Sequence, residues 1–240
     1  MKQELPMFSG FTPATEKFLE KLTKNNNRDW FAEHKTEYEN EVKLKAQSLI
    51  LALEQAFAVA GLPYMADIKK SMFRINRDTR FSKNKDPYKT NLGLFFPYKA
   101  EESGHRPIEA AGLYYHLEPG ESFIAGGLYM PMPDQLKAIR EKIANDWEEF
   151  EVITNDKKFK KEFPKMFYSE SLKRVPAGYP QDHPAAEWLK MKGFTAYCDI
   201  DFIDSYSPKL VKLLINKAAV AMPFHEFLHR GQVENRGMFK

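Results

Sequence analysis

The feature that most constrains the fold is a set of strand-like segments in the middle of the chain with no helical segment between them. Two of them, Ala110–Leu117 and Ser122–Tyr129, are joined by only four residues, which include Pro119-Gly120. Pro-Gly in so short a connection is a turn signal, so this pair is predicted to form an antiparallel hairpin. Met72–Arg77 and Leu92–Tyr98 are predicted to be further strands. Strands that follow one another without intervening helices favour a largely antiparallel sheet over a doubly wound parallel one.

Helical patterns precede this region. Thr12-Pro13 places an N-cap residue before a proline at the first helical position, where its missing N–H costs nothing. From Trp30 to Ala60 apolar residues recur at spacings of three, four and seven, which predicts an amphipathic helix with a break near Lys35–Thr36. Gly61 is predicted to end it.

Helical patterns return after the sheet, from Pro133 onward. Phe194–Ile203 alternates as a further strand would. Ser207-Pro208 repeats the cap-plus-proline signal and opens a last helix, which Pro223 is expected to end or restart.

These elements predict a single α+β domain over residues 1–240, with a central, largely antiparallel sheet flanked by N-terminal and C-terminal helices. The N-terminal helices occupy residues 1–62, and the sheet core with its basic motif occupies 68–130. Residues 131–230 hold the later helices and the strand near 194–203. No repeat or flexible linker divides the chain.

Composition limits the class of protein. Cys198 is the only cysteine, so no intrachain disulfide can form, which fits a reducing compartment. The N-terminus lacks an apolar stretch of signal-peptide length, and no run of 18 apolar residues exists. We therefore expect a cytoplasmic protein with no membrane span. The net charge of only +3 argues against a dedicated non-specific DNA binder.

Positive charge is concentrated in one segment, Lys69–Lys89. It holds eight basic and two acidic side chains, a net charge of +6, whereas the whole chain carries +3. The rest of the chain therefore carries −3. An excess of this size predicts a site for an anion, either an anionic small molecule or a nucleic acid.

Within this segment the arginines offer planar donor forks that suit phosphate or carboxylate. We expect Arg74, Arg77, Arg80 and Lys85 to hold such a ligand, with Tyr88 beside them. His116 and His183 are further candidates for the same pocket. The alternative is structural: Arg77, Asp78 and Arg80 form an internal ion-pair network, and the lysines are solvated.

A second hypothesis is a metal-dependent hydrolase. His116 and Glu118 share one face of a predicted strand, and Asp199 and Asp201 share one face of another. His183 or His105 could complete the site. The alternative is an ordinary polar sheet face, with these groups hydrogen-bonded, ion-paired or in solvent.

A third hypothesis is a non-enzymatic nucleic-acid or protein interaction module that uses basic and aromatic surface. Standard nucleotide-binding loops and the serine-hydrolase elbow are absent from the sequence. These patterns identify no reaction, catalytic residue, cofactor or oligomeric state, and we assign no metal ligand.

The pattern Arg74-x-x-Arg77-Asp78-x-Arg80-Phe81, followed by Asn84-Lys85-x-x-Tyr88, resembles that of the DUF2461 family of uncharacterised bacterial and fungal proteins. The resemblance covers nearly the whole chain, including the stretches GFTPATEKFLEKL and LYYHLEPGESFIAGGLYMP. It implies a soluble, single-domain protein of about this length. It supplies no reaction and no catalytic residues.

Overall fold

The computed structural model describes residues 5–99, 109–166 and 171–234. Within them the strands form one antiparallel sheet of five strands in the order β1-β2-β3-β5-β4. The strands are β1 (Leu92–Pro97), β2 (Gly112–Leu117), β3 (Phe123–Leu128), β4 (Lys165–Met166) and β5 (Phe194–Asp199). The predicted α+β fold with an antiparallel sheet is confirmed.

The β2–β3 hairpin forms where Pro119-Gly120 predicted it. Gly120 has a φ of +81°, a conformation that favours glycine because it has no Cβ. The Glu121 amide donates to the Glu118 carbonyl at 3.1 Å, and the Ser122 hydroxyl donates to the same carbonyl at 2.8 Å. The turn therefore satisfies its own polar groups and sets the register of the two strands.

Helices before the sheet follow the predicted signals. They are α1 (Pro13–Lys24), α2 (Arg28–Glu33), α3 (Lys35–Glu37), the π-helical segment η1 (Tyr38–Lys43) and α4 (Leu44–Val59). The break predicted near Lys35–Thr36 lies between α2 and α3. The Asn27 side chain caps α2 by accepting from the Trp30 amide at 2.9 Å.

Helices after the sheet are α6 (Pro133–Asn145), α7 (Trp147–Asn155), α8 (Lys157–Glu162), α9 (Ala186–Leu189), the 3-10 segment η3 (Phe202–Tyr206) and α10 (Lys209–Glu234). The expectation that Pro223 ends or restarts the last helix is wrong, because α10 continues through it. Proline costs a helix about 3 kcal/mol. Burial of Phe224, Phe227 and Leu228 immediately after it stabilises the continuous helix by a larger amount.

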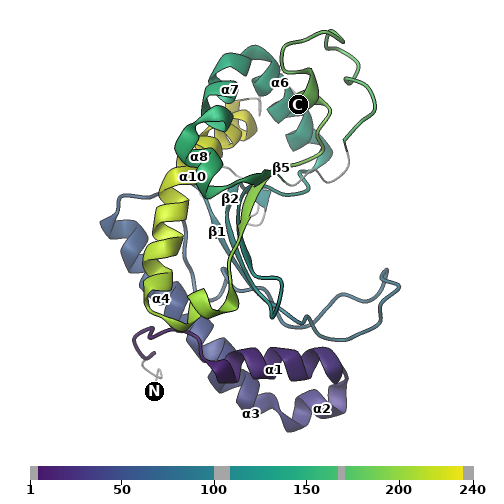
Figure 1. Cartoon of the computed structure of the whole chain (residues 1–240). Helices are drawn as coiled ribbons and strands as arrows, with labels where there is room; N and C mark the ends of the chain where they lie inside the picture. The colour runs from purple at the N-terminus through teal and green to yellow at the C-terminus, as the bar shows by residue number, and fades with distance from the viewer. Residues whose placement is uncertain (1–4, 100–108, 167–170, 235–240) are drawn as a thin grey trace.

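The two faces of the sheet have different surroundings. Tyr115 pairs with Ile124, which pairs with Cys198, and these side chains are buried together on one face. Figure 1 shows α10 along that side of the sheet, with α1–α3 grouped at one end of the molecule and α6–α8 at the other. The other face, called the open face below, carries Tyr114 and His116, which are only half-buried. Successive side chains of a strand point to opposite faces of the sheet, which explains the difference.

One continuous core joins the helices to the buried face of the sheet, with members as far apart in sequence as Phe18 and Leu228. This single core confirms the predicted one-domain α+β arrangement. No helix in the described part of the chain is both long enough and apolar enough to cross a membrane.

Candidate functional site

The basic segment Lys69–Lys89 begins beside β1 and then folds back on itself. The Phe73 amide donates to the Gly93 carbonyl at 3.0 Å, which adds this part of the segment to the edge of the sheet. Further on, the Arg77 amide donates to the Pro87 carbonyl at 2.9 Å. The expected continuous strand Met72–Arg77 is therefore replaced by isolated bridges, because the chain leaves β1 and pairs with its own returning half.

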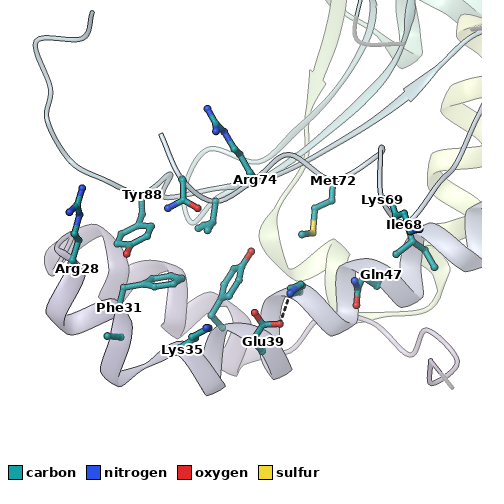
Figure 2. Close-up of a pocket in the computed structure, with 15 residues that line it drawn as sticks. Arg28, Phe31, Lys35, Glu39, Gln47, Ile68, Lys69, Met72, Arg74 and Tyr88 are labelled. Atoms are coloured by element: carbon teal, nitrogen blue, oxygen red, sulfur yellow. Dashed lines mark hydrogen bonds and ion pairs between the residues drawn. The ribbon is translucent and has the colours of Figure 1, made fainter. Parts of the chain in front are cut away.

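A groove of about 690 Å³ lies between this segment and the helices from α2 to α4 (Figure 2). We call it the basic groove, because its lining includes five cationic side chains and one acidic side chain, a net charge of +4. The cationic residues are Arg28, Lys35, Lys43, Lys69 and Arg74, and the acidic residue is Glu39.

Most of this charge forms no ion pair within the described part of the chain. Lys43 forms an ion pair with Glu39 at 2.7 Å. No carboxylate among the described residues forms an ion pair with the other four cations. Figure 2 shows Arg28 and Lys69 toward opposite ends of the groove. Arg74 stands at the rim, with its guanidinium directed away from the helices.

Aromatic side chains form the wall at the Arg28 end. Tyr88 is buried and stacks on Phe31, with ring centroids 4.0 Å apart. Asn26 holds the Tyr88 backbone from both sides: its amide nitrogen donates to the Tyr88 carbonyl at 3.0 Å, and its carbonyl oxygen accepts from the Tyr88 amide at 3.1 Å. This clamp joins the basic segment to the α1–α2 connection.

Tyr38 also lines the groove and contributes a neutral hydroxyl. Burial, and then the neighbouring charge of Glu39, raise the pKa of Tyr38 to about 12. The phenol therefore stays protonated at neutral pH. It can donate a hydrogen bond without adding negative charge to an otherwise cationic site.

The outer loop of the segment is held by its own ion pairs and lies outside the groove lining. Arg80 binds Asp78 through two hydrogen bonds, at 3.0 and 2.7 Å, and these bonds from Arg80 lower the pKa of Asp78 to about 2. Arg77 lies 4.0 Å from Asp86. Lys85 donates to the Thr79 carbonyl at 2.9 Å.

Of the residues expected to share one pocket, the structure places Arg74 and Tyr88 in the groove lining. Arg77, Arg80 and Lys85 are instead in the outer loop, and His116 is on the open face of the sheet. His183 accepts a hydrogen bond from the Ala185 amide at 3.0 Å, next to α9. This position is a local helix-start interaction.

Sequence analysis missed Arg28 and Lys35, which supply the opposite wall. Both lie on helices, about 40 or more positions before Arg74. In the sequence, a cation that lines a groove from a polar helix face looks the same as a cation that points into solvent. A nearby aromatic residue, Phe31, falls within the apolar pattern that predicts the helix from Trp30 onward, so it gave no separate signal of a site.

The residues of the metal hypothesis are only partly brought together. His116 Nε2 lies 3.0 Å from Glu118 Oε2. Asp199 forms an ion pair with Lys165, and the Asp201 amide donates to Asp204 at 3.2 Å at the start of η3. Within residues 5–99, 109–166 and 171–234, no three His, Cys, Asp or Glu side chains are grouped so as to hold a metal ion. His105 lies outside the described residues, and the hydrolase hypothesis stays a prediction.

Comparison with known proteins gives a single family. A family model described as a conserved hypothetical protein (DUF2461) matches residues 14–227 of the 240-residue chain. Searches of curated proteins and of solved structures found no match. The matched range includes nearly all of α1, the sheet, the basic groove and most of α10.

Proposed function

We propose that this chain, which belongs to the DUF2461 family, binds a phosphate- or carboxylate-bearing ligand in the basic groove. The observation that supports the proposal most directly is a set of four groove cations that form no ion pair with any carboxylate of the described residues: Arg28, Lys35, Lys69 and Arg74. Like charges gathered around one hollow repel each other, and an anion placed between them offsets that repulsion.

The groove also has the size and composition of a small-molecule site. Its volume of about 690 Å³ falls within the usual range of ligand pockets. It combines a few directed donors with the apolar surfaces of Phe31, Met72 and Ile75. A ligand with an anionic group and a flat apolar part would use both kinds of surface.

Isothermal titration calorimetry at low ionic strength would test the proposal, with inorganic phosphate, citrate, a nucleoside monophosphate and a short single-stranded oligonucleotide as probes. We expect binding of at least one of these anions, and we expect it to weaken as salt is added. An oligonucleotide that binds far more tightly than the monophosphate, with a steep salt dependence, would assign the groove to single strands.

Variants that replace one cationic side chain with a neutral one test whether the anion binds in the basic groove. Arg28→Gln and Lys35→Gln should each weaken binding roughly tenfold, since each removes one hydrogen bond to a charged group. Lys83→Gln is the matched control: it also removes one positive charge, from the basic segment at an exposed position outside the groove lining. Equal losses in all three variants, or no binding of any probe, would contradict the proposal.

A further inference from the structure

Three side chains on the open face of the sheet form a continuous chain of hydrogen bonds. The Tyr114 hydroxyl lies 2.9 Å from His116 Nδ1, and His116 Nε2 lies 3.0 Å from Glu118 Oε2. All three come from one strand and the residue that follows it, at alternate positions, so the pleat of β2 places them on one face.

The direction of these bonds follows from the chemistry of the groups. Glu118 is an acceptor, because hydrogen bonds from His116, and then from the Thr90 hydroxyl, lower the pKa of its carboxyl in spite of partial burial. Nε2 of His116 must therefore carry the proton, and Nδ1 is an acceptor, with the Tyr114 hydroxyl at 2.9 Å and the Asn91 amide nitrogen at 3.3 Å. Tyr114 donates to Nδ1: burial, and then the charge of Glu118, raise its pKa to about 12 and keep the phenol protonated.

The neighbouring residues hold this geometry in place. The His116 ring stacks on Phe123, with centroids 4.5 Å apart and an interplanar angle of 10°. The Tyr114 hydroxyl occupies the space above Gly93, where a Cβ would lie 2.8 Å from it. Glycine at this position lets the tyrosine cross over β1 to reach the histidine.

The chain of hydrogen bonds also reaches solvent. The side chains of His116 and Glu118 are 13% and 24% exposed. His225, by contrast, is fully buried in the core. Both ring nitrogens of His116 already have partners, so the chain ends at the Tyr114 hydroxyl, and Tyr114 is a partly exposed residue.

We propose that Glu118, His116 and Tyr114 form a proton relay that activates the Tyr114 hydroxyl as a nucleophile toward an ester. Carboxylate, imidazole and hydroxyl in this order are the arrangement by which side-chain oxygens are activated. The proposal concerns the open face and does not depend on the basic groove.

The step balances as follows. The Tyr114 oxygen bonds to the carbonyl carbon of the ester while its proton moves to His116 Nδ1. The imidazolium is held by Glu118 through the Nε2 proton. The bond between the carbonyl carbon and the leaving oxygen breaks, the leaving oxygen takes the bonding electrons, and it receives the proton from Nδ1. The products are an acylated tyrosine and an alcohol, and water attacking by the reverse proton path restores the phenol.

The surroundings indicate the class of ester. Phe73 and Phe123 flank Tyr114, with ring centroids 5.9 and 5.8 Å away. The Lys89 ammonium lies 5.0 Å from the Phe73 ring. Aromatic rings next to a cation suit an ester that has an aromatic part and an anionic substituent.

The test uses p-nitrophenyl acetate as the probe. The full-length protein is treated at neutral pH, p-nitrophenol release is followed by absorbance, and acetylated tyrosines are identified by peptide mass spectrometry. We expect Tyr114 to be acetylated faster than the other tyrosines of the chain, which serve as internal controls. Tyr114→Phe should abolish the fast phase of release.

Variants of the relay residues distinguish activation of the Tyr114 hydroxyl by the relay from reactivity that reflects solvent exposure alone. His116→Ala should slow acetylation of Tyr114 about 100-fold, the size of a general-base effect, and added free imidazole should restore part of the rate. Glu118→Gln should slow it and change its pH profile, and Glu118→Asp should recover activity. Thr195→Ser, a mild change elsewhere in the sheet, is the control for effects on folding.

Two kinetic results would overturn the proposal. One is a Tyr114 acetylation rate no faster than that of other half-exposed tyrosines in the wild-type protein. The other is a rate that is unchanged by His116→Ala in a variant shown by circular dichroism to be folded. Nitrogen NMR gives an independent measurement: a neutral His116 with its proton on Nδ1 would also exclude the relay.

Discussion

His225 should make the fold sensitive to mild acid. It lies in α10 and is fully buried. Its Nδ1 is 2.7 Å from the Tyr64 hydroxyl, and that hydroxyl donates to the Ala218 carbonyl at 2.9 Å. Since the hydroxyl proton is used there, Nδ1 of His225 is the donor and Nε2 has a free electron pair.

The Nε2 atom packs against the sheet without a hydrogen-bond partner among the described residues. A Cβ added to Gly126 would lie only 2.8 Å from it, so no room remains for an acceptor. Protonation would place a buried charge there without a counterion. Burial accordingly lowers the pKa of His225 to about 3.

The effect on stability follows from the direction of this shift. In the unfolded chain the histidine has its ordinary pKa of 6.5, so the unfolded state binds more protons than the folded state below that pH. The stabilising contribution is complete above pH 6.5 and is lost as the pH falls toward 3. At pH 5 the loss is about 2 kcal/mol, since each pKa unit corresponds to about 1.4 kcal/mol.

Urea unfolding at pH 7 and pH 5 measures this loss. His225→Asn keeps a donor for the Tyr64 hydroxyl and removes the titrating ring. The difference in unfolding free energy between wild type and variant should shrink by about 2 kcal/mol from pH 7 to pH 5. His34→Gln controls for the loss of a histidine at a half-exposed site. Parallel pH dependence of wild type and His225→Asn would refute the argument.

Three further substitutions and one control test the packing around the sheet and the groove, each by urea or thermal unfolding. Gly127→Ala should destabilise the fold by at least about 2 kcal/mol, because Gly127 has a φ of +133° and a Cβ would lie 2.0 Å from the Phe194 carbonyl oxygen. Gly120→Ala is the control: Gly120 has open space around it, so this change should destabilise the fold by only about 1 kcal/mol. Asn26→Ala should cost about 1–3 kcal/mol by leaving both Tyr88 backbone groups unpaired, and a cost below 0.5 kcal/mol would show that water replaces the clamp. Lys89→Met should leave the stability of the fold unchanged or raise it. Burial, and then the charge of Arg74, lower the pKa of Lys89, so its charged form is unfavourable in the folded state. A clear drop in melting temperature would contradict this expectation.

Local signals predicted most of the elements but not every boundary. Pro119-Gly120 located the hairpin because a tight turn depends on its own residues alone. The prediction that Pro223 ends or restarts the last helix was wrong because the rule for proline describes an isolated helix, whereas α10 packs against the core on both sides of that residue. Met72–Arg77 alternates as a strand does, but its hydrogen-bonding partner changes from β1 to the returning half of its own segment, and such a change leaves no pattern in the sequence.

The same distinction between local and long-range information applies to the site. The charge of the basic segment is visible in the sequence, and it led to Arg74 and Tyr88. Helices that are distant in the sequence decide which cations of the segment line the basic groove. Asp78 and Arg80, two positions apart in the motif, form an ion pair with each other at the surface, whereas Arg28 comes from α2.

The position of Lys89 connects the two surfaces that the basic segment separates. Its ammonium lies over Phe73 on the open face, yet it is close enough to Arg74, at the rim of the groove, for the charge of Arg74 to lower its pKa. A partly desolvated lysine this close to an exposed arginine works against folding at neutral pH. An anion near both would offset that repulsion, so an anion that binds in the groove should also raise the melting temperature of the wild-type protein. The rise should be smaller in Lys89→Met, because that variant has less repulsion for the anion to relieve.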